Sequence, residues 1–162
     1  MDKIEFNLLK AELEAQLKEI DKIYEEIKDR KKGAKRNKAK LESLGYKLHN
    51  LYCAFEDLFK IVARCFENNI MDISKYHKEM LKKMSLSIDG VRPALISDQS
   101  YRELDELRAF RHFFRHAYSY ELKYEKIIIP ISCAYRLKEI YRQDICRFLD
   151  IINKELGLEF QG

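Results

Sequence analysis

Two long runs of mostly apolar residues, spaced three and four apart, constrain this chain more than any other feature. The first run is Phe6, Leu9, Leu13, Gln16, Ile20, Ile23 and Ile27, and the second is Leu41, Leu44, Leu48, Leu51, Phe55, Leu58, Val62 and Cys65. This spacing is typical of a helix with one buried stripe. Two such helices, over residues 1–32 and 38–68, predict an antiparallel helix hairpin.

The rest of the chain also has helical patterns. We expect a short helix over residues 74–84 with Ser74 as its N-cap, and a long one over 98–122 capped near Asp98 or Ser100. A last helix over 130–156 should begin near Pro130 and stop at Gly157, burying Ala134, Leu137, Tyr141, Ile145, Phe148 and Ile152. Residues 87–98, with a turn signal at Asp89 and Gly90, predict a loop.

Composition supports one helical domain. The 162 residues include only five glycines and two prolines, and no strand pattern appears beyond residues 127–129. A chain of this length can bury one core. The sequence therefore predicts a single all-α domain over 1–162, an up-and-down bundle of four long helices and one short helix.

Charge and cysteine usage narrow the possible classes of protein. The net charge of +4 is too small to identify a nucleic-acid binder, although residues 31–40 contain six cations and no acid. That stretch is either a solvated turn or the basic edge of a site that attracts phosphate.

The cysteines and the hydropathy predict the compartment. The four cysteines form no C-x-x-C pair, so we expect buried free thiols rather than disulfides or zinc. Without an 18-residue apolar run, we expect a soluble, cytoplasmic protein that is not bound to membranes.

The candidate site is the stretch LRAFRHFFRHAYSY, residues 107–120. Its apolar stripe would consist of Leu107, Phe110, Phe114 and Ala117. Arg111 and Tyr118 would lie within ~20° of each other at the margin of that stripe, and His112 and His116 would project together from the far side.

Four interpretations of this stretch compete. It could be packing alone, although Arg111 would then place a charge where desolvation is costly. It could hold a metal through His112 and His116, but no glutamate lies between them and the flanking arginines repel cations, so we expect no metal site. It could cleave RNA, with a histidine as proton acceptor and an arginine binding phosphate. It could also bind a nucleotide or an acidic partner without catalysis.

Three residues outside the stretch have open interpretations. Glu56 and Asp57 interrupt an apolar run, either as outward charges or with one of them paired to an arginine of the central stretch. His77 is expected to be a packed or surface histidine rather than a ligand.

The arrangement Arg111-x4-His116-x-Tyr118 resembles the R-x4-H-x-Y signature of HEPN ribonuclease toxins, in the HepT branch of the HepT–MntA toxin–antitoxin modules. The segments at 51–67, 76–84, 91–97 and 110–122 are also similar to a HepT-like chain, so the resemblance covers most of residues 41–148.

This resemblance implies an HEPN-type helical homodimer with its cleft between protomers, acting as a metal-independent endoribonuclease without a cofactor. Arg111 and His116 would be the catalytic pair, and an MntA-like nucleotidyltransferase antitoxin would silence the enzyme by AMPylation of Tyr118. His112, Arg115 and Arg108 are secondary candidates for contacts to the RNA, a transfer or messenger RNA. The alternative is a catalytically silent HEPN bundle that binds a nucleotide or a partner protein.

Helical geometry complicates the catalytic pair. On an unbroken helix, Arg111 and His116 point ~140° apart. They can share a phosphate if the helix distorts near His116, if Arg111 reaches around, or if the pairs of two protomers meet across a twofold axis.

Overall fold

The fold was analysed in a computed structural model that describes residues 1–67, 76–116 and 121–157, without the side chains of residues 76–78. The helices are α1 (Lys3–Lys31), α2 (Lys38–Glu67), α3 (Tyr76–Met84), α4 (Asp98–His116) and α5 (Ile128–Glu155), with a 3-10 turn, η2 (Tyr124–Lys126). Within these described ranges there is no strand, only an isolated bridge between Ile88 and Arg92. The predicted bundle of four long helices and one short helix is confirmed.

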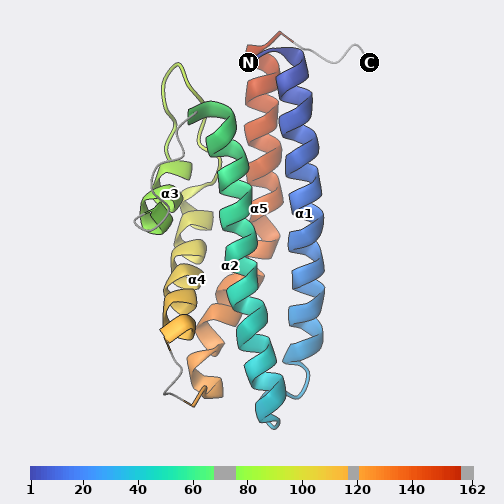
Figure 1. Ribbon diagram of the computed structural model, residues 1–162, viewed down its shortest axis with the longest axis vertical. Helices are drawn as coiled ribbons and strands as arrows, with labels where there is room; N and C mark the ends of the chain where they lie inside the picture. The colour runs from blue at the N-terminus through green and yellow to red at the C-terminus, as the bar shows by residue number, and fades with distance from the viewer. Residues whose placement is uncertain (68–75, 117–120, 158–162) are drawn as a thin grey trace.

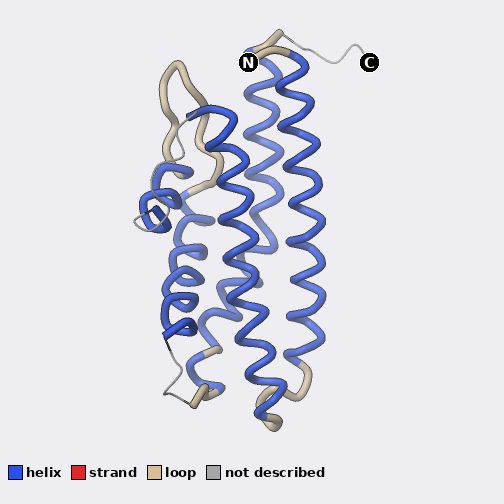
Figure 2. Tube along the Cα trace, viewed as in Figure 1, coloured by secondary structure: helices blue, strands red, loops and turns tan. Residues whose placement is uncertain are grey.

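The long helices run alongside one another (Figure 1). Short loops join them at the ends of the bundle, and the loop between α3 and α4 runs along its side (Figure 2). α1 and α2 form the predicted hairpin, α4 packs on both α2 and α5, and α3 packs against α4 and α2. α4 therefore lies with one side on α2, and this contact determines which of its side chains are buried.

The buried stripes follow the predicted periods with local differences. In α1, Leu17 and Tyr24 are buried, whereas the predicted Gln16 and Ile23 are only half-buried. Tyr24 can be buried because its hydroxyl donates to the Ala134 carbonyl at 2.9 Å. The stripe of α2 is confirmed except for Cys65, which is exposed. All six predicted core positions of α5 are buried.

The expectation of four buried thiols is wrong for two of them. All four cysteines are free; Cys133 is buried and Cys53 half-buried, but Cys65 and Cys146 are exposed. Cys65 lies at the edge of the apolar stripe of α2, where the period alone does not determine burial. Cys146 lies on the exposed face of α5, between Arg142 and Asp150.

Helix ends differ from prediction by a few residues. α4 is helical up to His116, and residues 117–120 lie outside the described part, as does Ser74. α5 begins two residues before Pro130, and Gly157, with φ 64°, follows it in the predicted left-handed conformation. No helix in the described part of the chain has both the length and the apolar character needed to cross a membrane.

The loop before α4 is anchored by a buried arginine. Arg92 is 3% exposed and lies 2.8 Å from Glu67 at the end of α2. It also donates to the backbone carbonyls of Lys83, Leu86 and Pro93. A charge buried this way is tolerated because each donor has an acceptor, and the loop thereby holds the start of α4 in place.

Asp144 of α5 fixes the beginning of α4. Its carboxylate accepts hydrogen bonds from the Ser97 backbone and hydroxyl and from the Ser100 hydroxyl, at 2.6–2.9 Å. The Ser97 hydroxyl in turn accepts from the Ser100 backbone N–H, as an N-cap does. The cap is therefore Ser97, one residue before the predicted Asp98, because the partner on α5 selects that position.

We expect Asp144→Ala to lower the free energy of unfolding by about 2 kcal/mol, because it leaves two hydroxyls and a backbone N–H without their acceptor. Urea unfolding measures the change. Asp150→Ala, at an exposed position of the same helix, is the matched control and should change stability by less than about 0.5 kcal/mol. Equal effects of the two substitutions would contradict the capping role.

Candidate active site

The apolar stripe in the second half of α4 packs against the rest of the helical bundle. Leu107 and Phe110 are buried and Phe114 is half-buried, whereas Ala117 lies outside the described residues. Phe114 contacts Phe110, with ring centroids 5.8 Å apart. α2 approaches closely here, since a Cβ added to Gly45 would come within 2.8 Å of the Phe114 ring. The stripe is confirmed for its described members.

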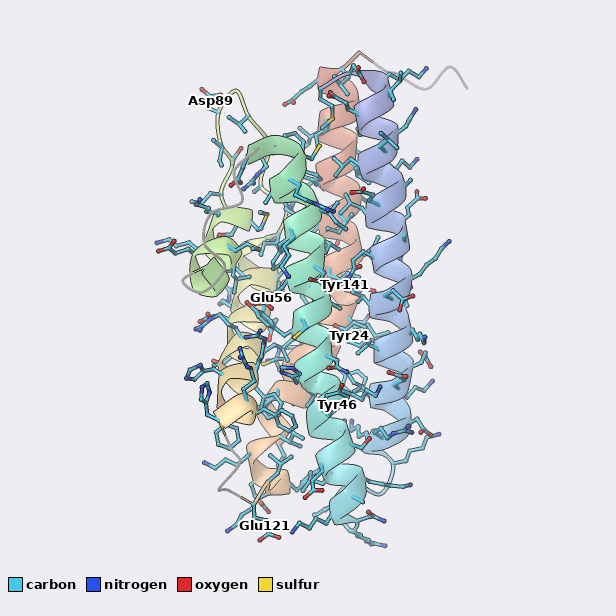
Figure 3. The ribbon with its side chains drawn as sticks, viewed as in Figure 1. Tyr24, Tyr46, Glu56, Asp89, Glu121 and Tyr141 are labelled. Carbon is cyan, nitrogen blue, oxygen red and sulfur yellow. The ribbon has the colours of Figure 1, made fainter. Side chains whose placement is uncertain are left out.

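Arg111 points into the bundle. Its side chain is 13% exposed, and its Nη2 lies 3.4 Å from Oε2 of Glu56, whose side chain is 5% exposed. Its Nε donates to Cys53 Sγ at 3.4 Å. Figure 3 shows Glu56 on α2 at the side that faces α4. The interpretation of Glu56 as the partner of an arginine is confirmed, whereas its neighbour Asp57 is exposed and pairs with Lys60.

This ion pair explains how a guanidinium can occupy the edge of an apolar stripe. Burial alone would lower the pKa of Arg111, but the hydrogen bond to Cys53 and the charge of Glu56 outweigh it, and the pKa is raised. Arg111 is therefore a fixed cation at the contact between α2 and α4. A guanidinium has five N–H donors, so donors remain for an anion such as phosphate.

Tyr52 adds a buried hydroxyl from α2. The residue is 0% exposed, and its Oη has no hydrogen-bond partner among the described residues. Burial is the main cause that raises the pKa of Tyr52, and the negative charge of Glu56 raises it further. The hydroxyl therefore stays neutral, beside a buried ion pair.

His49 brings an imidazole close to the motif helix. Its ring contacts the Phe114 ring in a tilted arrangement, with centroids 5.8 Å apart, and its Nε2 lies 3.7 Å from Cys53 Sγ. Burial, and then the charges of Arg111 and Arg115, lower the pKa of His49. Sequence analysis missed this residue, although His49, Cys53 and Glu56 are spaced four and three apart and thus share one face of α2.

We expect protonation of His49 to destabilise the fold. Because its pKa is lowered in the folded chain, the unfolded chain, with an ordinary pKa of about 6.5, binds the proton first as pH falls. The free energy of unfolding should thus decrease from about pH 6.5 down to the lowered pKa, with no contribution from this group above that window.

Urea unfolding at about pH 7.5 and about pH 5.5 tests this expectation. His49→Gln should remove part of the loss of stability at the lower pH. His112→Gln, at an exposed imidazole of α4, is the matched control. If His49→Gln loses as much stability as the native chain on acidification, the expectation is wrong.

His112 and His116 lie together on the solvent side of α4, as predicted, with ring centroids 4.5 Å apart. The Nδ1 of His116 lies 2.7 Å from the backbone carbonyl oxygen of His112. A carbonyl oxygen only accepts, so Nδ1 must be the protonated nitrogen. The neutral imidazole of His116 therefore has its lone pair on Nε2, the nitrogen a general base would use.

The structure does not bring Arg111 and His116 together within one chain. α4 is an unbroken helix between them, Arg111 is engaged with α2, and His116 is exposed. Of the secondary candidates, Arg115 is exposed like His112, and Arg108 is held by Asp105 at 2.7 Å. Tyr118 lies outside the described residues, and so does the side chain of His77.

No three His, Cys, Asp or Glu side chains in the described part of the chain come together in a way that could hold a metal ion. The arrangement instead offers a half-buried cation, Arg111, and an imidazole with a defined tautomer, His116. These two groups can bind a phosphate and move a proton.

Comparison with known proteins gives the family. No curated protein matches the chain, and no solved structure does so either. A family model described as HepT-like protein matches residues 43–152, which is more than half of the chain. The matched region runs from α2 through most of α5 and includes Glu56, Arg111 and His116. The chain belongs to the HepT-like protein family.

Proposed function

We propose that this protein is the toxin of a toxin–antitoxin pair, an HEPN-type endoribonuclease that cleaves RNA without a metal ion. The observation that carries the proposal is the imidazole of His116, with its tautomer set by the His112 carbonyl, inside the region matched by the HepT-like family. The half-buried cation Arg111, five residues earlier on the same helix, supplies the second group that the chemistry needs.

In the proposed reaction, His116 Nε2 takes the proton from a ribose 2′-hydroxyl. The 2′-oxygen attacks the adjacent phosphorus, the bond from phosphorus to the 5′-oxygen breaks, and the leaving oxygen takes up a proton from water. The His116 imidazolium returns its proton to the solvent, which restores the neutral base. The products are a 2′,3′-cyclic phosphate and a 5′-hydroxyl. Arg111 stabilises the negative charge that builds on the phosphoryl oxygens, which its planar fork of donors suits.

The site is proposed to be shared between two protomers. In one chain Arg111 faces α2 and His116 faces solvent, without a break in the helix between them. Of the three ways to bring the pair to one phosphate, this geometry favours a twofold axis that joins Arg111 of one protomer to His116 of the other. Activity would then require the homodimer.

Regulation is proposed to act through Tyr118. A partner nucleotidyltransferase would transfer AMP from ATP to the tyrosine hydroxyl, with pyrophosphate leaving. The adenylate adds bulk and a phosphate charge two residues from His116, and that charge would compete with RNA for Arg111.

The experiment measures intact mass of the chain produced with and without an MntA-like nucleotidyltransferase, together with RNA cleavage in EDTA. Adenylate-sized mass increments on Tyr118, absent in Tyr118→Phe, and EDTA-resistant cleavage by the unmodified form alone are the expected results. Unmodified chain that leaves RNA intact and is harmless to cells would contradict the proposal.

One observation favours the alternative, a silent bundle that binds a nucleotide or a partner protein. Arg111 is already engaged by Glu56 and Cys53, so its donors are partly used. Host toxicity on expression separates the two functions. Toxicity lost both in Arg111→Ala and in His116→Ala, whose fold should be unaffected, supports the ribonuclease, whereas native chain without toxicity supports the silent bundle.

A further inference from the structure

Tyr46 is an exposed aromatic ring next to the candidate site. It is 54% exposed, and every other Tyr or Phe side chain in the described part of the chain is buried or half-buried. Its ring stacks on His49, with centroids 6.3 Å apart and an interplanar angle of 24°, and the His49 ring in turn contacts the Phe114 ring in a tilted arrangement. Tyr46 is thus the outer end of a stack of rings whose inner end is packed in the bundle. The Lys47 ammonium lies 5.9 Å from the centroid of this ring and adds a cation beside it. A supported ring that is more than half exposed, with a cation next to it, suits the face of a nucleobase and its phosphate.

The basic turn, defined as residues 31–40, lies at the N-terminal end of α2, which is the end nearer to Tyr46. Asn37 caps the helix through the Lys40 N–H, and the Lys40 ammonium donates to the Lys32 carbonyl, so the turn has a fixed shape. Two of its cations, Lys35 and Arg36, are exposed, and their side chains have no ion pair or hydrogen bond within the described residues. These two charges are available to phosphates.

α2 connects these features to Arg111. Lys38 pairs with Glu121 at 2.9 Å, which ties the start of α2 to the segment after α4. Figure 3 shows Glu56, Tyr46 and Glu121 in that order along the bundle. With ~1.5 Å of rise per residue, Tyr46 is roughly 12 Å along the helix axis from Lys38 and about 15 Å from Glu56. A cation, a ring and a second group of cations therefore follow one another along α2.

We propose that Tyr46 and the basic turn bind the unpaired part of an RNA chain that extends from Arg111, and so make single-stranded RNA the substrate class. This rests on the proposed ribonuclease function. Unpaired bases offer their faces for stacking, whereas the bases of a duplex are stacked on one another. An acidic protein partner would use the cations but would not need an open ring supported by a ring stack.

The test measures equilibrium binding of a roughly 12-nucleotide single-stranded RNA, within the range of about 4–16 nucleotides known for single-strand binding modules. 2′-O-methyl sugars prevent its cleavage. A self-complementary duplex of the same sugars is the comparison. The full-length dimer is used as native chain, Tyr46→Leu, Tyr46→Phe and Lys35→Ala/Arg36→Ala. Lys10→Ala/Lys18→Ala, at exposed positions of α1, removes the same charge as a matched control.

Tyr46→Leu is expected to weaken single-strand binding by roughly 5- to 150-fold, the range of one base stacked on an aromatic ring. It should leave duplex binding unchanged, and Tyr46→Phe should bind like the native chain. Lys35→Ala/Arg36→Ala should reduce the slope of log affinity against log salt by about 0.7 for each phosphate that the variant no longer neutralises, whereas the control pair should not.

This inference would be overturned, while the ribonuclease function stands, if Tyr46→Leu bound single strands like the native chain. It would also be overturned if Lys35→Ala/Arg36→Ala and Lys10→Ala/Lys18→Ala had equal effects. In both cases the native chain still cleaves RNA in EDTA. A native chain that neither binds nor cleaves RNA would overturn the inference and the proposed function together. Equal weakening of duplex and single-strand binding by Tyr46→Leu would also overturn it, because stacking on unpaired bases would not be involved.

Discussion

Arg111→Ala is expected to lower the free energy of unfolding by about 3 kcal/mol and RNA cleavage by roughly 10²- to 10³-fold. The stability is lost because Glu56, 5% exposed, loses the ion pair with the guanidinium, which is one of the interactions that offset the desolvation of its carboxylate. Cleavage is lost because no cation stabilises the charge on the phosphate during the reaction. Urea unfolding and a cleavage assay in EDTA measure the two effects.

A second substitution separates the effects. In Arg111→Ala/Glu56→Gln the buried charge is removed as well, so part of the stability should return while cleavage stays low. Arg108→Ala is the matched control for stability, because Arg108 pairs with the more exposed Asp105 and its loss should cost less than about 1 kcal/mol. A single variant as stable as the native chain would contradict the structural role of the pair. Recovery of cleavage in the double variant would contradict the catalytic role of Arg111.

The sequence was sufficient for the fold because helical periods determine which faces are buried. The six core positions of α5 follow directly from that period, and so does the stripe of α4. The structure differs from the predicted pattern where a contact with another helix determines the cap or the burial of a residue. Ser97 caps α4 because Asp144 of α5 binds there, and Tyr24 is buried because a carbonyl of α5 accepts its hydroxyl proton.

The candidate site was predictable on α4 and, on α2, only at Glu56. Its motif lies in one continuous stretch, and the pairing of His112 with His116 follows from their spacing. Which residues of α2 face the motif depends on how α2 and α4 are aligned along each other. The hydrophobic period within each helix does not determine that alignment. Glu56 could be considered because a charge in an apolar run needs a partner. His49, Tyr52 and Cys53 have no such signal, because each is compatible with ordinary packing.

His116→Ala is expected to reduce RNA cleavage by about 10²- to 10⁴-fold, the usual contribution of a general base. The fold should be unaffected, because His116 is exposed at the end of α4 and its hydrogen bond is to a backbone carbonyl. His112→Ala is the matched control. It removes the neighbouring ring but retains the carbonyl that sets the tautomer of His116, so the cleavage rate should fall much less. Equal losses in the two variants would contradict the assignment of the base to His116.

Mixed dimers then test whether the site is shared. Co-expression of His116→Ala chains with Arg111→Ala/Glu56→Gln chains gives mixed dimers in which one of two shared sites has both catalytic residues intact. With random pairing about half of the dimers are mixed, so cleavage should recover to about a quarter of the native rate. Sites contained within one protomer would give no recovery, because each chain lacks one member of the pair. No recovery in dimers that are confirmed to be mixed would contradict a site built across the twofold axis.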